Sequence, residues 1–399
     1  MRTALDIRTP REREAAPPGD ARAYRWTIVG PERHPLAPAL RAASRDDAPE
    51  AVAVLLGRAF HRVDNRRLLR AIRAAVARGS RLAVVHLGAG GGSLARAAAV
   101  EHPGLSCVVA ELTEGPAPAA VRAATDLVTA ASPVAGEVRV DRDGRLRTTD
   151  WQPVHLPPAA GPAGPGGAVL VTGGLGGLGL RAAAVLACRH GLHPVLADTA
   201  TPDRLGTAGR RHLDRMAGTT GVTVLRADVT DSAALRRALA ATGHLRLAGV
   251  VHCAGLLRGG PVTAGTAAGL SAVQAAKVDG LRHALDAVDR HALRRVLVFG
   301  SITAERPHRS LGAYALANEL LRRCAVRLAA DLPAAVTLVA EWSIWSGAGM
   351  AHGTPGAVAA ARRLNLPPVP LGPGMAAVDA LWGLPAAPGR AQRLLISGR

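Results

Sequence analysis

Four side chains that can donate a proton, hold a charge or bind a polarised oxygen lie at defined spacings in the last third of the sequence. Ser301 directly follows an apolar run, Tyr314 comes 13 residues later, and Asn318 lies one helical turn beyond it. Lys277 precedes Tyr314 by 37 residues and is the single lysine among 49 basic residues. Because an ammonium is compact and its pKa responds to its surroundings, this lysine suggests a site that a guanidinium cannot fill.

A glycine-rich segment follows the apolar run AVLV and precedes an amphipathic stretch. Its residues Gly173, Gly177 and Gly179 match the TGxxxGxG spacing of short-chain dehydrogenases. Such glycines allow a tight turn and a close approach of the backbone to a pyrophosphate at a helix N-terminus. Asp198 ends the next apolar run, where a carboxylate can accept hydrogen bonds from a ribose. We therefore predict a dinucleotide site with these loop contacts: Thr172, Gly173, Gly174, Leu175, Gly176, Gly177 and Leu178.

A second glycine-rich segment, residues 86–93, also lies between an apolar run and an amphipathic stretch. A ribose-binding loop needs an acidic residue about 20 positions later, at the end of a second strand. We expect no acidic residue at the corresponding strand end here. We therefore expect this second loop not to bind a nucleotide.

Apolar runs and Ala- and Arg-rich amphipathic stretches alternate around these segments, which predicts an α/β fold with parallel strands. The alternation occurs over residues 21–155 and again, more completely, after a stretch rich in Pro, Gly and Ala. We predict two tandem Rossmann-like units: a truncated structural subdomain at residues 1–157, a linker at 158–167, and a complete catalytic subdomain at 168–399.

Composition excludes several classes of protein. Hydrophobic residues make up 48% of the 399 residues, which excludes a largely disordered chain. No apolar run approaches the ~18 residues of a membrane span, and the N-terminal residues lack the apolar core of a secretory signal. Four widely separated cysteines are typical of the reducing cytoplasm and favour neither a metal site nor disulfides. A net charge of +19 raises nucleic-acid binding as one hypothesis, but the arginines are dispersed and aromatic residues make up only 2%.

The spacings of Lys277, Ser301, Tyr314 and Asn318 resemble those of ketoreductase domains of polyketide synthases, which belong to the short-chain dehydrogenase superfamily. Typical members of the superfamily carry YxxxK, whereas these ketoreductases carry YxxxN with the lysine on an earlier helix, as here. The resemblance extends to the family's structural subdomain and to its WGPWxxxGM segment, which is similar to residues 341–350. It is nearest to ketoreductases of iterative bacterial synthases.

The resemblance implies reduction of a β-ketoacyl thioester on an acyl carrier protein, with NADPH as the hydride donor and other synthase domains as possible partners. Tyr314 would protonate the developing alkoxide, its phenol pKa lowered by Lys277. Ser301 would bind the carbonyl oxygen, and Asn318 would position Lys277 or a relay water. The resemblance also implies further cofactor contacts: Asp228, Val229, Cys253, Ala254 and Gly255.

Three departures from the family pattern leave alternatives open. Asp198-Thr199 stands where an arginine usually binds the 2′-phosphate of NADPH, so NADH is an alternative unless Arg204 or Arg210 reaches that phosphate. Neither stereochemical fingerprint is present: the LDD motif reads LRG at residues 257–259, and the tryptophan position is Arg306. The missing arginine and the altered segment WSIWSG, residues 342–347, leave a catalytically silent structural module of a synthase as the alternative function.

Overall fold

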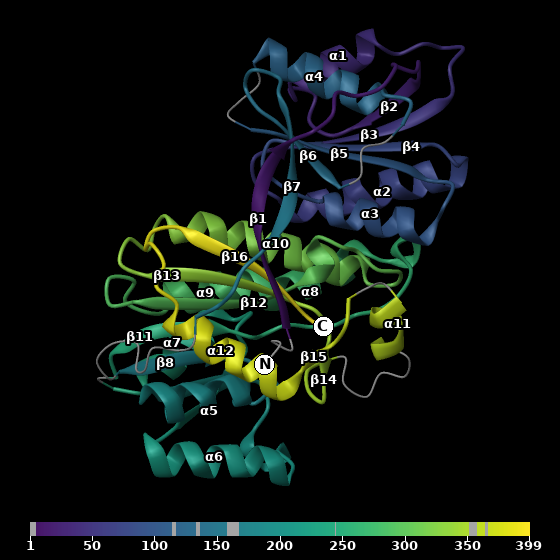
Figure 1. The fold of residues 1–399 in the computed structure, drawn as a ribbon. Coiled ribbons are helices and arrows are strands. Elements are labelled where there is room, and N and C mark those ends of the chain that lie inside the picture. Colours follow the sequence, from purple (N-terminus) through teal and green to yellow (C-terminus); the bar gives the residue numbers. More distant parts are fainter. Residues whose placement is uncertain are drawn as a thin grey trace.

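The computed structural model describes residues 5–113, 117–132, 136–157, 167–243, 245–350, 357–363 and 366–399. Nine of the ten residues of the predicted linker lie outside these ranges. The described residues form an α/β fold, as predicted, with 14 strands in one continuous sheet (Figure 1). No helix in the described ranges is long and apolar enough to cross a membrane.

The C-terminal half contains seven parallel strands in the order β10-β9-β8-β11-β12-β13-β16. The strands are β8 (Ala168–Thr172), β9 (His193–Asp198), β10 (Thr223–Arg226), β11 (Leu247–His252), β12 (Arg295–Ser301), β13 (Val336–Trp342) and β16 (Ala391–Gly398). Most are continuous runs of buried Val, Leu and Ala, as expected for strands covered on both faces. The order reverses at β8, which creates a topological switch between β8 and β11.

Helices cover both faces of these strands. One face packs against α5 (Gly179–His190), α6 (Thr207–Thr219) and α12 (Leu371–Gly383). The other packs against α7 (Ser232–Ala240), α9 (Gly280–Asp286) and α10 (Gly312–Ala329). The remaining helices and strands of this half are α8 (Ala267–Gln274), α11 (Ala357–Arg363), β14 (Trp345–Ser346) and β15 (Val369–Pro370).

The N-terminal half repeats the alternation on a smaller scale. Its strands are β2 (Arg25–Val29), β3 (Glu50–Leu56), β4 (Arg81–His86), β5 (Ser106–Leu112), β6 (Glu137–Val140) and β7 (Leu146–Pro153). Its helices are α1 (Leu36–Ala42), α2 (Arg62–Arg78), α3 (Gly92–Glu101) and α4 (Pro118–Thr129). Strands β2 to β6 are parallel, and β7 turns back antiparallel to β6.

Strand β1 (Leu5–Glu14) joins the two halves (Figure 1). It pairs antiparallel with β16 over its first residues and with β7 over its later ones. This strand lies outside the alternation predicted over residues 21–155, and its later residues, PRERE, are charged. They are tolerated because this part of β1 is half-exposed or exposed.

The halves also share a hydrophobic core. Leu94 on α3 packs in one cluster with Leu316 and Leu320 on α10 and with Val262 and Leu270 from the preceding part of the C-terminal half. Helix α10 carries Tyr314 and Asn318. The position of this helix is therefore set from both halves of the molecule.

Candidate functional site

The predicted functional residues gather at the carboxyl ends of β8, β11 and β12, beside the topological switch where open α/β sheets bind ligands. Thr172 ends β8 and His252 ends β11, and the hydroxyl of Thr172 lies 2.8 Å from Nδ1 of His252. The other imidazole nitrogen lies 2.9 Å from the carbonyl oxygen of Lys277. Burial lowers the pKa of His252 to about 3, and the charge of Lys277 acts in the same direction. His252 therefore serves as a neutral link between the glycine-rich loop and Lys277.

The glycine-rich loop between β8 and α5 is tightly folded. Gly173 has φ +65°, and a Cβ there would lie 2.9 Å from the amide nitrogen of Ala254. A Cβ on Gly179 would lie 2.2 Å from the carbonyl oxygen of Gly173. Only glycine fits both positions, so the chain turns sharply into α5. This geometry brings the N-terminus of α5 to the edge of a cavity.

That cavity has a volume of about 310 Å³. Ten of the predicted cofactor contacts line it: Gly173, Gly176, Gly177, Leu178, Asp198, Asp228, Val229, Cys253, Ala254 and Gly255. Three predicted contacts do not. Thr172 is buried against His252, Gly174 packs on Leu196, and the side chain of Leu175 enters the core. A glycine-lined cavity beside a helix N-terminus fits a nucleotide phosphate. The three other residues support the loop by packing against the protein interior.

The carboxylate of Asp198 already has backbone partners. One oxygen accepts a hydrogen bond from the amide of Leu175 at 3.0 Å, and the other accepts one from Ala200 at 3.0 Å. Asp198 therefore fixes the glycine-rich loop, and it also lines the same cavity. Arg210 donates instead to carbonyl oxygens in its own segment, and neither Arg204 nor Arg210 lines the cavity.

Lys277 lies in a π-helical turn, Ala275–Asp279, between α8 and α9. Such turns recur at functional sites because they redirect a side chain out of the regular helix. The side chain is 2% exposed, and Nζ donates to the carbonyl oxygen of Phe299 at 3.1 Å. Burial lowers the pKa of Lys277 to about 8. Gly255 leaves room for the lysine, since a Cβ there would lie 3.0 Å from Cε of Lys277.

Ser301 ends β12 and begins a short 3-10 helix, Ile302–Ala304. Its hydroxyl oxygen accepts hydrogen bonds from the amide of Thr303 at 3.3 Å and from the hydroxyl of Thr303 at 3.0 Å. Because both contacts use Ser301 as acceptor, its own proton is available to a substrate oxygen.

Tyr314 lies on the first turns of α10, with Nζ of Lys277 5.7 Å from its ring centroid. Burial raises the pKa of Tyr314, an effect that Asn318 and Ser301 partly oppose. The expectation of a lowered phenol pKa was wrong, because desolvation of the phenol dominates. Asn318 donates to the carbonyl oxygen of Tyr314 at 2.8 Å, and its own amide oxygen is buried without a protein partner in the described residues.

A second cavity, of about 300 Å³, adjoins the first and shares Leu178, Cys253, Gly349 and Met350 with it. Lys277, Ser301 and Tyr314 line the second cavity, and Asn318 does not. Its other walls are largely apolar: Leu257, Phe299, Ile302, Leu311, Trp342, Ile344, Trp345, Ala348 and Leu366. The arrangement places groups that can donate a proton in an apolar chamber beside the glycine-lined cavity.

Sequence reasoning missed Glu101, at the end of α3 in the N-terminal half. Its carboxylate accepts hydrogen bonds from the amides of Val262 and Ser310, both at 2.8 Å. Ser310 is the single described non-glycine residue with positive φ, at 62°. Arg309 in the same loop lines the apolar chamber. Glu101 therefore holds a loop of the active-site region from the other half, and no local pattern indicates that contact.

The second glycine-rich loop contains an internal anion. The carboxylate of Glu319 accepts hydrogen bonds from the amide of Gly91 at 3.0 Å, the amide of Ser93 at 2.9 Å and the hydroxyl of Ser93 at 2.6 Å. Our reason for excluding a nucleotide was wrong, because an acidic residue, Glu111, does occupy the penultimate position of β5. Its carboxylate pairs with Arg323 on α10 at 2.8 Å.

The comparisons with known proteins agree with this arrangement. Residues 167–347 match the family model described as the KR domain. The pikromycin polyketide synthase component PikAIII of Streptomyces venezuelae is 30% identical over 276 residues, which cover 65% of this chain and 16% of that protein. Polyketide synthase GfsA of Streptomyces halstedii is 36% identical over 192 residues, which cover 47% of this chain and 2% of that protein. The chain therefore spans only a small part of either relative.

Solved structures establish the fold over almost the whole chain. PlmKR1, a ketoreductase from the first module of phoslactomycin biosynthesis in Streptomyces sp. HK803, superposes with a TM-score of 0.78 at 24% identity, covering 99% of this chain and 93% of that one. A ketoreductase domain from the bacillaene assembly line gives 0.75 at 19% identity, covering 99% and 97%. The KR-domain match over residues 167–347 and the synthase relatives together support a ketoreductase domain of a polyketide synthase, and the chain as a whole has the fold of such ketoreductases.

Proposed function

We propose that this chain reduces the β-ketone of an acyl thioester carried on an acyl carrier protein, with a reduced nicotinamide dinucleotide as hydride donor. The observation that carries the proposal is the convergence of Lys277, Ser301 and Tyr314 on an apolar chamber that adjoins a glycine-lined cavity. Ketoreduction in polyketide biosynthesis is the chemistry of the family that the KR-domain match and the synthase relatives support.

The glycine-rich loop, Asp198, Asp228 and Val229 would hold the dinucleotide, which when bound supplies a hydride to the substrate carbonyl carbon. Ser301 donates a hydrogen bond to the carbonyl oxygen and so orients it. Tyr314 donates its phenolic proton to the same oxygen as negative charge develops there. Lys277 supplies a positive charge beneath the phenol. The amide oxygen of Asn318 has no protein partner among the described residues, so it would accept a hydrogen bond from a water that relays the proton to Tyr314.

A phenol whose pKa is raised by burial stays protonated before the reaction, which suits a proton donor. The ammonium of Lys277 then stabilises the phenolate left behind. Apolar walls keep water away from this exchange and strengthen both interactions. The chamber is therefore suited to a neutral ketone that becomes transiently anionic.

We further propose that the cavity accepts NADH as well as NADPH. Asp198 faces the ribose position with a negative charge, and its neighbour Thr199 brings no positive charge. Arg210 is engaged with the carbonyl oxygens of Asp203 and Leu205. A 2′-phosphate would therefore lie beside a carboxylate without an arginine held ready for it.

Replacing Tyr314 by Phe tests the proposed function. Turnover of a β-ketoacyl thioester should fall about 10²–10⁴-fold, because the general acid is lost while the ring remains. Nucleotide affinity, measured by fluorescence of the bound reduced nicotinamide, should stay the same. Equal turnover in the variant would remove Tyr314 from the mechanism, and no turnover above background in either protein would favour the silent module.

A further inference from the structure

The N-terminus of α3 is built as an anion site, and the anion comes from the chain itself. Glu319 is 0% exposed and approaches two backbone amides and one hydroxyl of the loop, at the distances given above. Gly90 and Gly91 have φ of +87° and +107°. A Cβ on Gly90 would lie 2.7 Å from Oε1 of Glu319, so the loop accepts the carboxylate only because this position is glycine.

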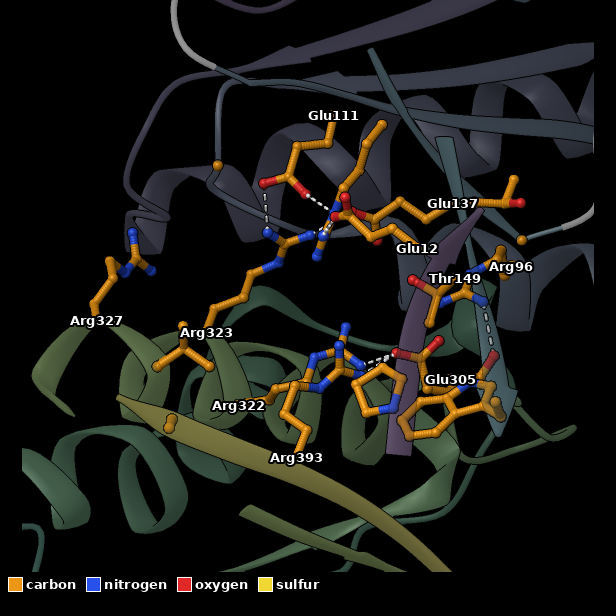
Figure 2. Close-up of a pocket in the computed structure, with 18 of the residues that line it drawn as sticks. Glu12, Arg96, Glu111, Glu137, Thr149, Glu305, Arg322, Arg323, Arg327 and Arg393 are labelled. Carbon is orange, nitrogen blue, oxygen red and sulfur yellow. Dashed lines mark hydrogen bonds and ion pairs between the residues drawn. The ribbon is translucent and has the colours of Figure 1, made fainter. Parts of the chain in front are cut away.

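Helix α10 brings a cation to the same region one turn later. Arg323 contacts Glu319 at 3.4 Å and Glu111 at 2.8 Å, and it also pairs with Glu137. Figure 2 shows Arg323 extending from α10 toward Glu111. Burial raises the pKa of Glu319, but the charges of Arg323 and Arg322 and the hydrogen bond from Ser93 together outweigh that effect and hold the pKa below its usual value. The buried carboxylate therefore remains an anion.

A nucleotide on a Rossmann unit offers an anion to the glycine-rich loop and hydrogen-bond donors to the acidic residue of the next strand. Glu319 and Arg323 make the same two kinds of contact, to the α3 N-terminus and to Glu111. We propose that the α3 loop is a carboxylate-binding site that α10 occupies with Glu319, and that this occupancy positions Tyr314 and Asn318 on the same helix. Glu319 is thus a positioning residue for the proposed reaction.

The partner of Glu319 borders a cavity. Arg323 lines a cavity of about 840 Å³ between the two halves, together with Gly88, Arg58, Arg306 and Arg327. Figure 2 shows Arg323 and Arg327 at this cavity. Glu319 does not line the cavity, but its partner Arg323 does. Shortening Glu319 would leave a gap beside Arg323 that a small anion could fill, which makes the proposal testable by chemical rescue.

The test uses the full-length Glu319→Ala variant with sodium formate, and sodium chloride at equal ionic strength as reference. We expect the midpoint of thermal unfolding to fall by about 5 °C and kcat by about 10-fold, with the KM for the nucleotide within twofold of wild type. Formate should restore both quantities along a saturation curve with a half-point of about 1–100 mM. Leu320→Ala is the matched control, because it removes buried contacts of the same helix without opening an anion site.

Equal responses of the Glu319→Ala and Leu320→Ala proteins to formate would overturn the proposal. Should the Ala variant not fold, Glu319→Gln replaces it, since the amide keeps the shape and one acceptor oxygen but loses the charge. A Gln variant with wild-type stability and kcat would likewise overturn it. The positioning role depends on the proposed reductase function, but the unfolding midpoint does not. If formate stabilises the Glu319→Ala variant but the wild-type protein has no reductase activity, the proposed function is contradicted and the carboxylate site is not.

Discussion

The two glycine-rich loops of this chain are built alike, but one borders an open cavity and the other binds a glutamate side chain of the same chain. Each follows a buried parallel strand, β4 or β8, opens a helix, α3 or α5, and has an acidic residue at or near the end of the next strand. The α5 loop faces a cavity of about 310 Å³, whereas the α3 loop is filled by Glu319. A helix N-terminus attracts an anion in both cases. Whether that anion is a ligand or a side chain is decided by a residue 226 positions away in the sequence.

Substitutions in the two loops should therefore have different effects. Around the open loop, changes should alter nucleotide binding and turnover while leaving the fold intact. Around the filled loop, changes should first lower stability, and turnover should follow only through the position of α10.

Replacing Lys277 by Arg should lower kcat on the order of 100-fold. The lysine is buried between Gly255 and Phe299, where the larger planar group cannot place its charge beneath Tyr314. Steady-state kinetics should be combined with nucleotide titration, in which the variant is expected to bind normally. Wild-type kcat in the variant would show that only the charge of Lys277 matters.

The pH profile provides a control for the same residue. Burial lowers the pKa of Lys277 to about 8, so its ammonium is complete below pH 7 and disappears as the pH rises through 8. Wild-type kcat/KM should therefore decline above pH 8. In the arginine variant that decline should be absent, because guanidinium stays charged.

One substitution in each loop gives the most direct test of the comparison. Gly177→Val adds a side chain to the cavity wall of the open loop and should raise the Kd for reduced nicotinamide dinucleotide at least about 10-fold, with a small change in unfolding midpoint. Gly90→Ala pushes against Glu319 and should lower the unfolding midpoint by several degrees with an unchanged Kd. The reverse pattern would mean that the filled loop, rather than the open one, serves the ligand.

Asp198→Asn should shift the cofactor preference toward NADPH by about 10-fold. The amide keeps an acceptor for the backbone of Leu175 or Ala200 and removes the negative charge beside a 2′-phosphate. The measurement is the ratio of kcat/KM for the two cofactors in both proteins. The prediction is wrong if the wild type already prefers NADPH and the Asn variant has the same preference. The 2′-phosphate would then bind away from Asp198.

The smallest effect concerns the carrier protein. Arg309 is exposed at the chamber, so Arg309→Glu should lower kcat/KM a few-fold for a substrate on an acidic carrier protein. The loss should shrink in 1 M salt, where the Debye length is ~3 Å. A small-molecule thioester should show no difference between the proteins. Identical losses for both substrates would point to a role inside the chamber instead.

The alternation of apolar and amphipathic runs predicted the fold class, and residue spacing together with the resemblance to ketoreductases predicted the residues that meet at the open site. Lys277, Ser301 and Tyr314 come from separate elements, yet a parallel sheet brings the ends of its strands and the following helices to one edge. The phenol pKa was predicted with the wrong sign, because desolvation depends on all the atoms packed around Tyr314. Glu101 and Glu319 were missed because each acts across the boundary between the halves, where no periodicity or local motif records the partner.

Strand β1 has a consequence for the order of events during synthesis. Its residues Leu5 to Arg8 pair with Leu395 to Gly398, so this ladder waits until the last strand has left the ribosome. At about 5–20 residues per second, the delay is roughly 20–80 s. Strands β2 to β7 can pair during that interval, while β1 lacks the neighbour on its other side and presents an unpaired edge. The charged run Arg11 to Glu14 is exposed on this strand, and charges on an edge strand disfavour edge-to-edge aggregation.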